Sequence, residues 1–516
     1  MKRVARKLKP RPRAYTAELG NKQQPRIRER LQVIAIGCTI SLAIFLLLLT
    51  SPRTLERLSS SFYDNQLTLV DQKPVVANTL TIIDIDETSL KQIGQWPWSR
   101  NRIAELLEKI NQHSPAAVGI DALFTEPDHT SPVEVQRQLL QQFGSTISLD
   151  AIPADQRDYD ATLSRVLASG PFILSYFFDF NGNTTDECLP RAVNMALLTS
   201  AEQTQAKQAL HQPSGLLCNI DTLSASAPAA GFINGRPDND GIYRRTPLVI
   251  TYQDRLYPSF ALQTLSTALG AEQLLLKSES DGFSLKLANN TIPLDRAGNL
   301  LLHFTDTETT YQHVSASTLL NDSIDPALIK DRIILIGVSA TGLQDYRPTP
   351  LNPLSTGIEF HATIVDNILQ GKFLAYPSSA HFAELSSVLL AGGLFSVLMA
   401  WSGPIAIMLS ALLSMFLLCT NSYILFHQMD TVISPFPAIV TICIIVIITA
   451  LFKYWQEQHR SRHITQQILL SQEATIEGFG AMAEYRDPET GGHIKRTQNY
   501  VKVLAQALKN HPRFHS

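Results

Sequence analysis

The sequence has no excess of basic residues. Its 516 residues include 43 Lys and Arg against 46 Asp and Glu, which gives a formal net charge of −3. Affinity for nucleic acid that is carried by phosphate contacts needs a basic surface, so we expect no nucleic acid among the main partners. The length is enough for two or three domains.

Cysteine is scarce, with five residues in the whole chain. Cys38, Cys419 and Cys443 fall in apolar stretches, where a small thiol is unremarkable. Cys188 and Cys218 are the remaining two, and they lie thirty residues apart in a region rich in Pro, Gly and Asn. In an oxidising compartment an even count favours a disulfide between these two, with buried free thiols as the alternative.

Between residues 51 and 383 the sequence has no apolar run long enough to cross a membrane. The most hydrophobic window there, residues 171–180, has the length of a buried strand. Runs of membrane length lie on both sides, one at residues 31–50 and three within residues 384–452. A signal peptide at 31–50 would have a shorter apolar core and a small-residue cleavage site. The sequence therefore predicts four transmembrane helices, with the lipid bilayer as a partner.

Basic residues flank these runs unevenly. Residues 1–30 contain eleven Lys or Arg against two acidic residues, and Lys453, Arg460 and Arg462 follow the last run. A basic tail can bind nucleic acid, but next to an apolar run it is more typical of the cytoplasmic side of a membrane. We therefore expect a cytoplasmic tail at 1–30, both termini in the cytoplasm, and residues 51–383 outside.

The exterior segment has the mixed pattern of an α/β domain. Apolar strands are predicted at residues 80–85 and 116–124, and Ser99 can cap a helix between them. A strand, a helix and a strand within about 45 residues imply a right-handed crossover and a parallel pair. Polar segments at 125–160 and 181–230 are interpreted as long surface insertions. Further strands are expected at 172–178, 248–252, 300–304 and 333–336, and helices at 260–269 and 357–369.

Short motifs are spread over about 300 residues of this segment: Ile83-Asp-Ile-Asp-Glu-Thr-Ser-Leu90, Trp96-Pro-Trp-Ser-Arg100, Val118-Gly-Ile-Asp121, Asp238-Asn-Asp-Gly-Ile-Tyr-Arg-Arg-Thr-Pro247, Tyr257-Pro-Ser259, Leu335-Ile-Gly-Val-Ser-Ala340, Asp345, Thr349-Pro350 and Gly357-Ile-Glu-Phe-His-Ala362. Together they resemble the second CHASE class, an extracellular sensor domain of bacterial receptors that is followed by three membrane helices. The resemblance implies a receptor in the bacterial inner (plasma) membrane that senses an unknown extracytoplasmic ligand.

Three aspartates stand at the ends of predicted strands. Asp84 and Asp86 end the first strand, and Asp121 lies in the second. Parallel α/β sheets commonly bind ligands at the carboxyl ends of their strands, so these residues are candidates for a sensor pocket. The alternative is that they serve as helix caps and turn residues.

The segment after the last apolar run, residues 453–475, has the pattern of a signalling helix. An alternating spacing of four and three residues forms a heptad-like seam that could pair two protomers, and it consists of Thr465, Leu469, Gln472, Ile476, Phe479 and Ala483. We expect a homodimer. An amphipathic helix that docks on its own catalytic domain would show the same pattern.

Near the end of the chain, Glu489 and His493 stand four residues apart. In a helix their side chains project from one face about one turn apart, which is the spacing that two ligands of one metal need. On spacing alone, a solvated helix face is the alternative.

The run Tyr485-Arg-Asp-Pro-Glu-Thr-Gly-Gly-His493-Ile-Lys-Arg496, in the segment 476–516, resembles the start of the all-α HD-GYP domain. That family hydrolyses cyclic di-GMP at a centre of two or three metals. The resemblance implies that Glu489 and His493 are metal ligands for iron or manganese and that Arg496 supports them. The His-Asp and Gly-Tyr-Pro motifs of the family are absent, so we expect this chain to bind no metal and to be inactive.

These features predict a multidomain membrane receptor that controls a cytoplasmic cyclic di-GMP phosphodiesterase. A second hypothesis is a non-catalytic membrane sensor that acts by protein–protein interaction through its cytoplasmic helix. A receptor joined to a nucleotide cyclase or kinase is disfavoured, because the residues after Gly480 resemble neither.

Overall fold

The structure is a computed structural model of the chain. It describes residues 15–509 except 51, 70–78, 183–194, 198–205, 207, 272, 306–309, 344, 376 and 487. The chain divides into two compact units. We call Phe45–Val388 with Leu413–Ile439 the α/β unit, and Met1–Ile44 with Leu389–Leu412 and Val440–Ser516 the helical unit.

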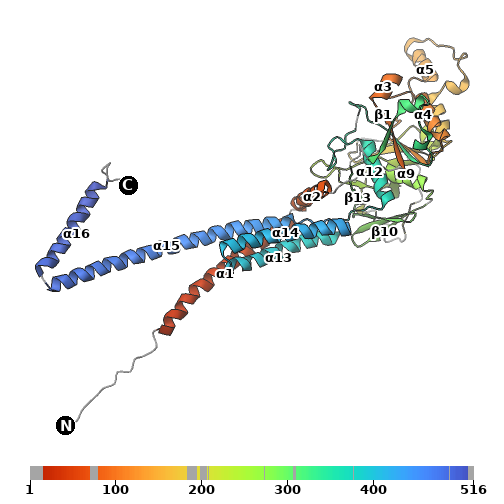
Figure 1. Ribbon diagram of the computed structural model, residues 1–516. Helices are drawn as coiled ribbons and strands as arrows, with labels where there is room; N and C mark the ends of the chain where they lie inside the picture. Colours follow the sequence, from red (N-terminus) through yellow and green to blue (C-terminus); the bar gives the residue numbers. More distant parts are fainter. Residues whose placement is uncertain are drawn as a thin grey trace, which may run out of the picture. The chain divides into compact units, whose positions relative to one another are not determined.

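A mainly parallel sheet forms the centre of the α/β unit (Figure 1). Its strand order is β14-β1-β15-β2-β3, and β3 also pairs in parallel with β6 and antiparallel with β5. Every residue of β1 is buried, as expected for a parallel strand with both faces covered. The strands are β14 (Gln312–Ser315), β1 (Leu80–Ile85), β15 (Ile333–Val338), β2 (Ala117–Ile120), β3 (Phe172–Asp179), β6 (Ala229–Phe232) and β5 (Gly215–Leu217).

Helices cover both faces of this sheet, because alternate residues of each strand point to opposite sides. Ile82 packs into a core with α9 (Phe260–Ala268) and α12 (Gly357–Gln370). Ile83, the next residue, packs into a second core with α4 (Arg100–Gln112). The remaining short helices are α3 (Glu87–Ile93), α5 (Pro132–Phe143), η1 (Ala154–Gln156), α6 (Tyr159–Leu167), α8 (Asp221–Ser226), α11 (Ala316–Leu320) and η2 (Pro326–Leu328).

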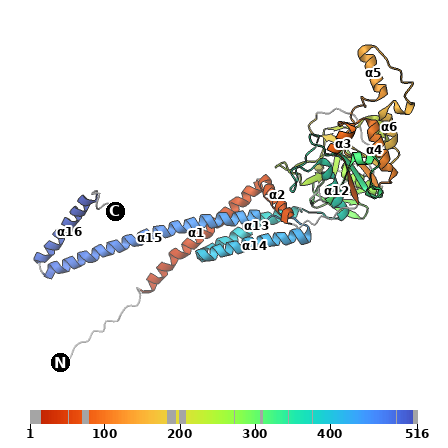
Figure 2. The same cartoon turned by 45° about the horizontal axis from the view of Figure 1, so that its top comes forward.

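Smaller sheets complete the unit. A four-stranded sheet has the order β12-β11-β10-β4, and two ribbons pair β7 with β13 and β8 with β9. The strands are β4 (Met195–Leu197), β7 (Arg245–Pro247), β8 (Val249–Tyr252), β9 (Arg255–Pro258), β10 (Leu274–Glu279), β11 (Gly282–Leu287), β12 (Asn290–Leu294) and β13 (Asn299–Leu301). Helix α5 projects away from the sheets in both views (Figures 1 and 2), and none of its residues is buried.

Two sequence expectations about this unit are wrong. β1 and β2 are parallel but are not neighbours, because β15 hydrogen-bonds to both of them. The polar segment 181–230 is not only a surface insertion, because β5 lies within it and β6 begins at its end, and both pair with β3. The second predicted strand is also shorter than expected, since β2 ends at Ile120.

Four helices in the described part of the chain are long and apolar enough to cross a membrane, over Ile27–Thr50, Ser379–Trp401, Pro404–Met429 and Phe436–Met482. The last apolar run and the expected linker form one continuous helix, α15, without a break at residue 453. The long helices are α1 (Tyr15–Thr50), α2 (Pro52–Leu69), α13 (Ser378–Trp401), α14 (Pro404–Met429), α15 (Phe436–Arg486) and α16 (Pro488–Leu508).

Small residues let α1 and α13 approach closely in the helical unit. Gly37 of α1 faces Ser396 of α13, and Ser41 of α1 faces Gly392 of α13. Each helix thus has a glycine and a serine four residues apart, and each glycine lies opposite a serine of the other helix. A Cβ added at either glycine would overlap the opposing serine side chain. Such small-residue packing is typical of membrane helices, because the hydrophobic effect does not favour their association within the bilayer.

We expect Gly392→Leu to lower the thermal stability of the protein in detergent, because overpacking costs about 1–3 kcal/mol. Gly393→Leu is the matched control, since a Cβ at Gly393 has no atom within 4 Å among the described residues. The unfolding midpoint can be followed by size-exclusion chromatography after heating. Equal midpoints for the two variants would contradict the packing.

Candidate functional site

Helix α2 packs its apolar face onto the rest of the α/β unit. Phe62, Tyr63 and Leu67 are buried in the same core as α9 and α12, and their spacing is that of one helix face. The Tyr63 hydroxyl donates a hydrogen bond to the backbone oxygen of Leu302. Asp64, the next residue, therefore points along the edge of the buried face.

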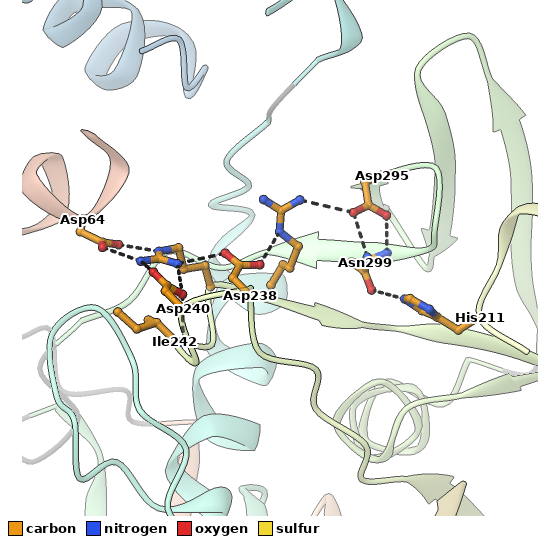
Figure 3. Close-up of polar contacts among 9 residues, drawn as sticks. Asp64, His211, Asp238, Asp240, Ile242, Asp295 and Asn299 are labelled. Atoms are coloured by element: carbon orange, nitrogen blue, oxygen red, sulfur yellow. Dashed lines mark hydrogen bonds and ion pairs between the residues drawn. The ribbon is translucent and has the colours of Figure 1, made fainter. Parts of the chain in front are cut away.

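Arg244 holds this carboxylate to the domain. The residue is only 2 % exposed. Its Nε and Nη2 donate to the two Asp64 oxygens at 2.8 and 2.7 Å, a bidentate pair between residues 180 positions apart (Figure 3). Nη1 and Nη2 also donate to Asp240 at 3.0 and 2.7 Å, and Nη1 to Asp238 at 3.1 Å. Three carboxylates thus surround one buried guanidinium.

A tight turn places Asp238 and Asp240 on the same guanidinium. The Gly241 amide donates to the backbone oxygen of Asp238, and Gly241 has φ +86°, a value that favours glycine. Burial lowers the pKa of the Arg244 guanidinium, but its hydrogen bonds to Asp64 and Asp240 more than offset this, so the net pKa lies above the usual value. The same hydrogen bonds lower the pKa of Asp240.

A second chain of polar contacts runs along the β7–β13 ribbon (Figure 3). Arg245 lies 3.4 Å from Asp238 and 3.8 Å from Asp295. Asn299 donates through Nδ2 to Asp295 at 2.9 Å, so its Oδ1 accepts from His211 Nε2, also at 2.9 Å. His211 Nδ1 is then the acceptor for Arg236 Nη1 at 3.1 Å.

These two networks meet at a cavity of about 230 Å³. Four arginines line it, Arg57 of α2 together with Arg236, Arg244 and Arg245. Other lining residues are Ser60, His211, Pro237, Asp238, Asn239, Asp240 and Asn299. We call this the arginine cavity. Sequence reasoning noticed the Asp238–Pro247 segment only as a family motif, and nothing in the sequence linked it to Asp64.

The three candidate aspartates, at strand ends of the central sheet, have separate environments. Asp84 lies 2.6 Å from His313 Nδ1 on β14. Asp86 caps α3 by accepting from the Ser89 amide at 2.8 Å. Burial would raise the pKa of Asp86, but the hydrogen bonds from Ser89 and Ser315 lower it. The capping alternative is thus confirmed for Asp86.

Asp121 stands apart from these two, because β15 separates β1 from β2 and puts their ends about 10 Å apart. Burial raises the pKa of Asp121 to about 6, and the charge of Arg347 opposes the rise. Asp121 lines a different cavity, of about 370 Å³, beside Trp96, Trp98 and Phe124. A shared pocket for all three aspartates stays a prediction.

Cys218 is disulfide-bonded. Cys188 lies outside the described residues, so the pairing of the two stays a prediction. The cysteines expected in apolar helices, Cys38, Cys419 and Cys443, are free.

The C-terminal candidates all lie on α16. His493 and Arg496 are exposed, and His493 Nδ1 is 3.4 Å from Thr497 Oγ1. The side chain of Glu489 lies outside the described residues. Among the residues that the structure does describe, no three His, Cys, Asp or Glu side chains come close enough to hold a metal. The metal site expected at Glu489 and His493 therefore stays a prediction, and we derive no reaction step through it.

Comparison with known proteins identifies two parts of the chain. A short stretch is 60% identical over 37 residues to a probable cyclic di-GMP phosphodiesterase of Vibrio cholerae, and another match is 45% identical over 62 residues to a cyclic di-GMP phosphodiesterase of the same organism. These matches cover 7% and 10% of this chain, and the chain spans only 8% and 13% of the two relatives. No solved structure matches.

The second part is much larger. The family model of the CHASE2 domain matches residues 39–401, which include α2, the whole central sheet and α13. The arginine cavity and the three aspartates all fall within this range. The chain belongs to the CHASE2 domain family.

Proposed function

We propose that this protein is a bacterial inner-membrane receptor whose CHASE2 domain senses an extracytoplasmic stimulus and controls cyclic di-GMP hydrolysis by an HD-GYP domain. The observation that carries the proposal is the combination, in one chain, of a CHASE2 domain with a stretch 60% identical to a probable cyclic di-GMP phosphodiesterase. Four helices apolar enough to cross a membrane support the membrane location.

The proposed orientation has both termini in the cytoplasm. Two contacts in the helical unit support it. The Arg30 guanidinium lies 5.6 Å from the centre of the Trp401 ring, and Lys453 donates to the backbone oxygen of Met399. Basic residues of two other helices therefore gather at the Trp401 end of α13, and basic residues are typical of the cytoplasmic ends of membrane helices.

Helix α15 is the proposed signal path. Its 51 residues include both the last apolar run and the expected linker. Leu469, Ile476 and Phe479 of the expected seam are 58%, 59% and 64% exposed. We propose that a second copy of α15 covers them in a homodimer. The same exposed residues support the second candidate function, a sensor that acts through protein contacts of this helix without catalysis.

The test joins this chain to the segment that follows the matched stretch in one of the two Vibrio cholerae cyclic di-GMP phosphodiesterases. We expect the joined protein to hydrolyse cyclic di-GMP and to carry metal, and His493→Ala to lower both by at least tenfold. Lys502→Ala is the control, because residue 502 is exposed nine positions further along α16, on the opposite face.

Hydrolysis and metal content that survive His493→Ala would show that His493 belongs to a solvated helix face. No hydrolysis by the joined protein, with the CHASE2 domain folded, would favour the non-catalytic sensor.

A further inference from the structure

We propose that the arginine cavity binds a small anion, through a phosphate, sulfate or carboxylate group held by Arg57 and Arg236. This deepens the proposed function by naming the ligand class of the sensor, and only its signalling role rests on that function. The binding itself follows from the charges, geometry and size of the cavity.

The carboxylates of the cavity are already bound. Asp240 accepts two hydrogen bonds from Arg244, and Asp238 contacts both Arg244 and Arg245. Arg57 and Arg236 line the same cavity and have no carboxylate within ion-pair distance among the described residues. Two exposed guanidinium groups of the lining, one on each of two elements, therefore remain without a counter-charge among the described residues.

A chain of hydrogen bonds orients the Arg236 side chain. Its Nη1 donates to His211, which donates to Asn299, which donates to Asp295. Asp295 also accepts a hydrogen bond from the backbone amide of Asn299 at 2.8 Å. The end of this chain of hydrogen bonds away from Arg236 is therefore fixed to the β7–β13 ribbon. Among the described residues, this chain of hydrogen bonds contacts one nitrogen of the guanidinium, so the other nitrogens can bind a ligand. An arginine fixed in this way loses less freedom on binding.

The size of the cavity limits the ligand. Its volume of about 230 Å³ lies below the range of about 300–1,000 Å³ that is usual for drug-sized ligands. A planar guanidinium binds phosphate and carboxylate oxygens through two parallel hydrogen bonds. Ser60 and Asn299 add uncharged polar side chains to the lining. A small phosphate, sulfate or dicarboxylate fits these limits.

An anion between Arg57 and Arg236 would connect two elements. Arg57 belongs to α2, which follows α1 in the chain, and Arg236 belongs to the segment that leads to β7. Arg244 and Asp64 already join the same two elements by an ion pair that needs no ligand. The bound anion would add a second, ligand-dependent connection beside this ion pair.

The test uses the full chain in nanodiscs of zwitterionic lipid. Inorganic phosphate, sulfate and succinate are titrated by calorimetry at constant ionic strength, with chloride as the balancing anion. We expect saturable binding of at least one of them. Arg57→Gln and Arg236→Gln should each raise its Kd about tenfold or more, which corresponds to about 1.4 kcal/mol. Arg255→Gln, an exposed arginine of β9, should leave the Kd unchanged.

Absence of saturable binding by all three anions would overturn the proposal, and so would an unchanged Kd in Arg236→Gln. Neither variant removes Arg244 or its carboxylates, so the thermal midpoint should stay at the wild-type value and confirm folding. Cyclic di-GMP plays no part in this measurement. A negative result would therefore not contradict the proposed control of cyclic di-GMP hydrolysis.

A second set of nanodiscs distinguishes the sources of the anion. If anionic phosphatidylglycerol in the disc weakens phosphate binding while the Arg236→Gln protein shows no such effect, the cavity binds a lipid headgroup phosphate. If phosphate binding is the same in both lipids, the ligand is a soluble anion.

Discussion

Arg244→Met is expected to lower the free energy of unfolding of the α/β unit by about 3–5 kcal/mol, the usual cost of removing one partner from a buried ion pair. The substitution leaves Asp64, Asp238 and Asp240 together without the guanidinium that all three contact. The loss can be measured by denaturant unfolding in detergent, with tryptophan fluorescence as the signal, since two of the four tryptophans, Trp96 and Trp98, lie in this unit.

The control for Arg244→Met is Arg255→Met, which removes an exposed arginine and should change stability by less than about 0.5 kcal/mol. Adding Asp64→Asn to Arg244→Met should restore part of the loss, because one of the uncompensated charges is removed. If Arg244→Met were as stable as the control, the three-carboxylate network would not be what holds α2 to the domain.

The second large effect is expected at Glu384, which is completely buried near the start of α13. Its carboxylate accepts from the Ser59 hydroxyl of α2 at 3.0 Å and from the backbone amide of Ser434 at 2.8 Å, just before α15. Glu384→Leu leaves both donors buried without this acceptor, at about 1–3 kcal/mol for each. We expect a loss of about 2–6 kcal/mol in the same unfolding measurement.

Glu384→Gln is the matched variant for Glu384→Leu. Its amide oxygen can still accept from Ser434 and Ser59, so most of the stability should remain. A Gln variant as unstable as the Leu variant would show that the negative charge, and not the acceptor geometry, joins α2, α13 and the start of α15.

Local patterns predicted the elements of the sensor domain well. The strand predicted at 80–85 is confirmed as β1, and the helices predicted at 260–269 and 357–369 are confirmed as α9 and α12 within one residue at each end. Each of these has its own apolar periodicity, and α12 also has a capping box made by Thr356 and Glu359.

Long-range pairing could not be predicted in the same way. The sequence near β1 and β2 contains nothing that shows a third strand between them, because β15 comes more than 200 residues later. The Asp64 to Arg244 pair has the same difficulty, since an exposed-looking aspartate on an amphipathic helix can pair with any arginine of the domain. The candidate site was therefore not predicted, although one of its two segments, Asp238–Pro247, was noted as a motif.

The late position of β15 also determines when the domain can fold. About 250 residues separate the end of β1 from the start of β15, and synthesis at about 5–20 residues per second takes roughly 12–50 s to supply them. During that time the edges of β1 and β2 that later pair with β15 lack their partner, and each offers unpaired backbone groups to other chains. The nascent domain is therefore most prone to aggregation in this interval. We expect a chaperone that covers strand edges during synthesis to raise the yield of folded protein more than one that acts after synthesis.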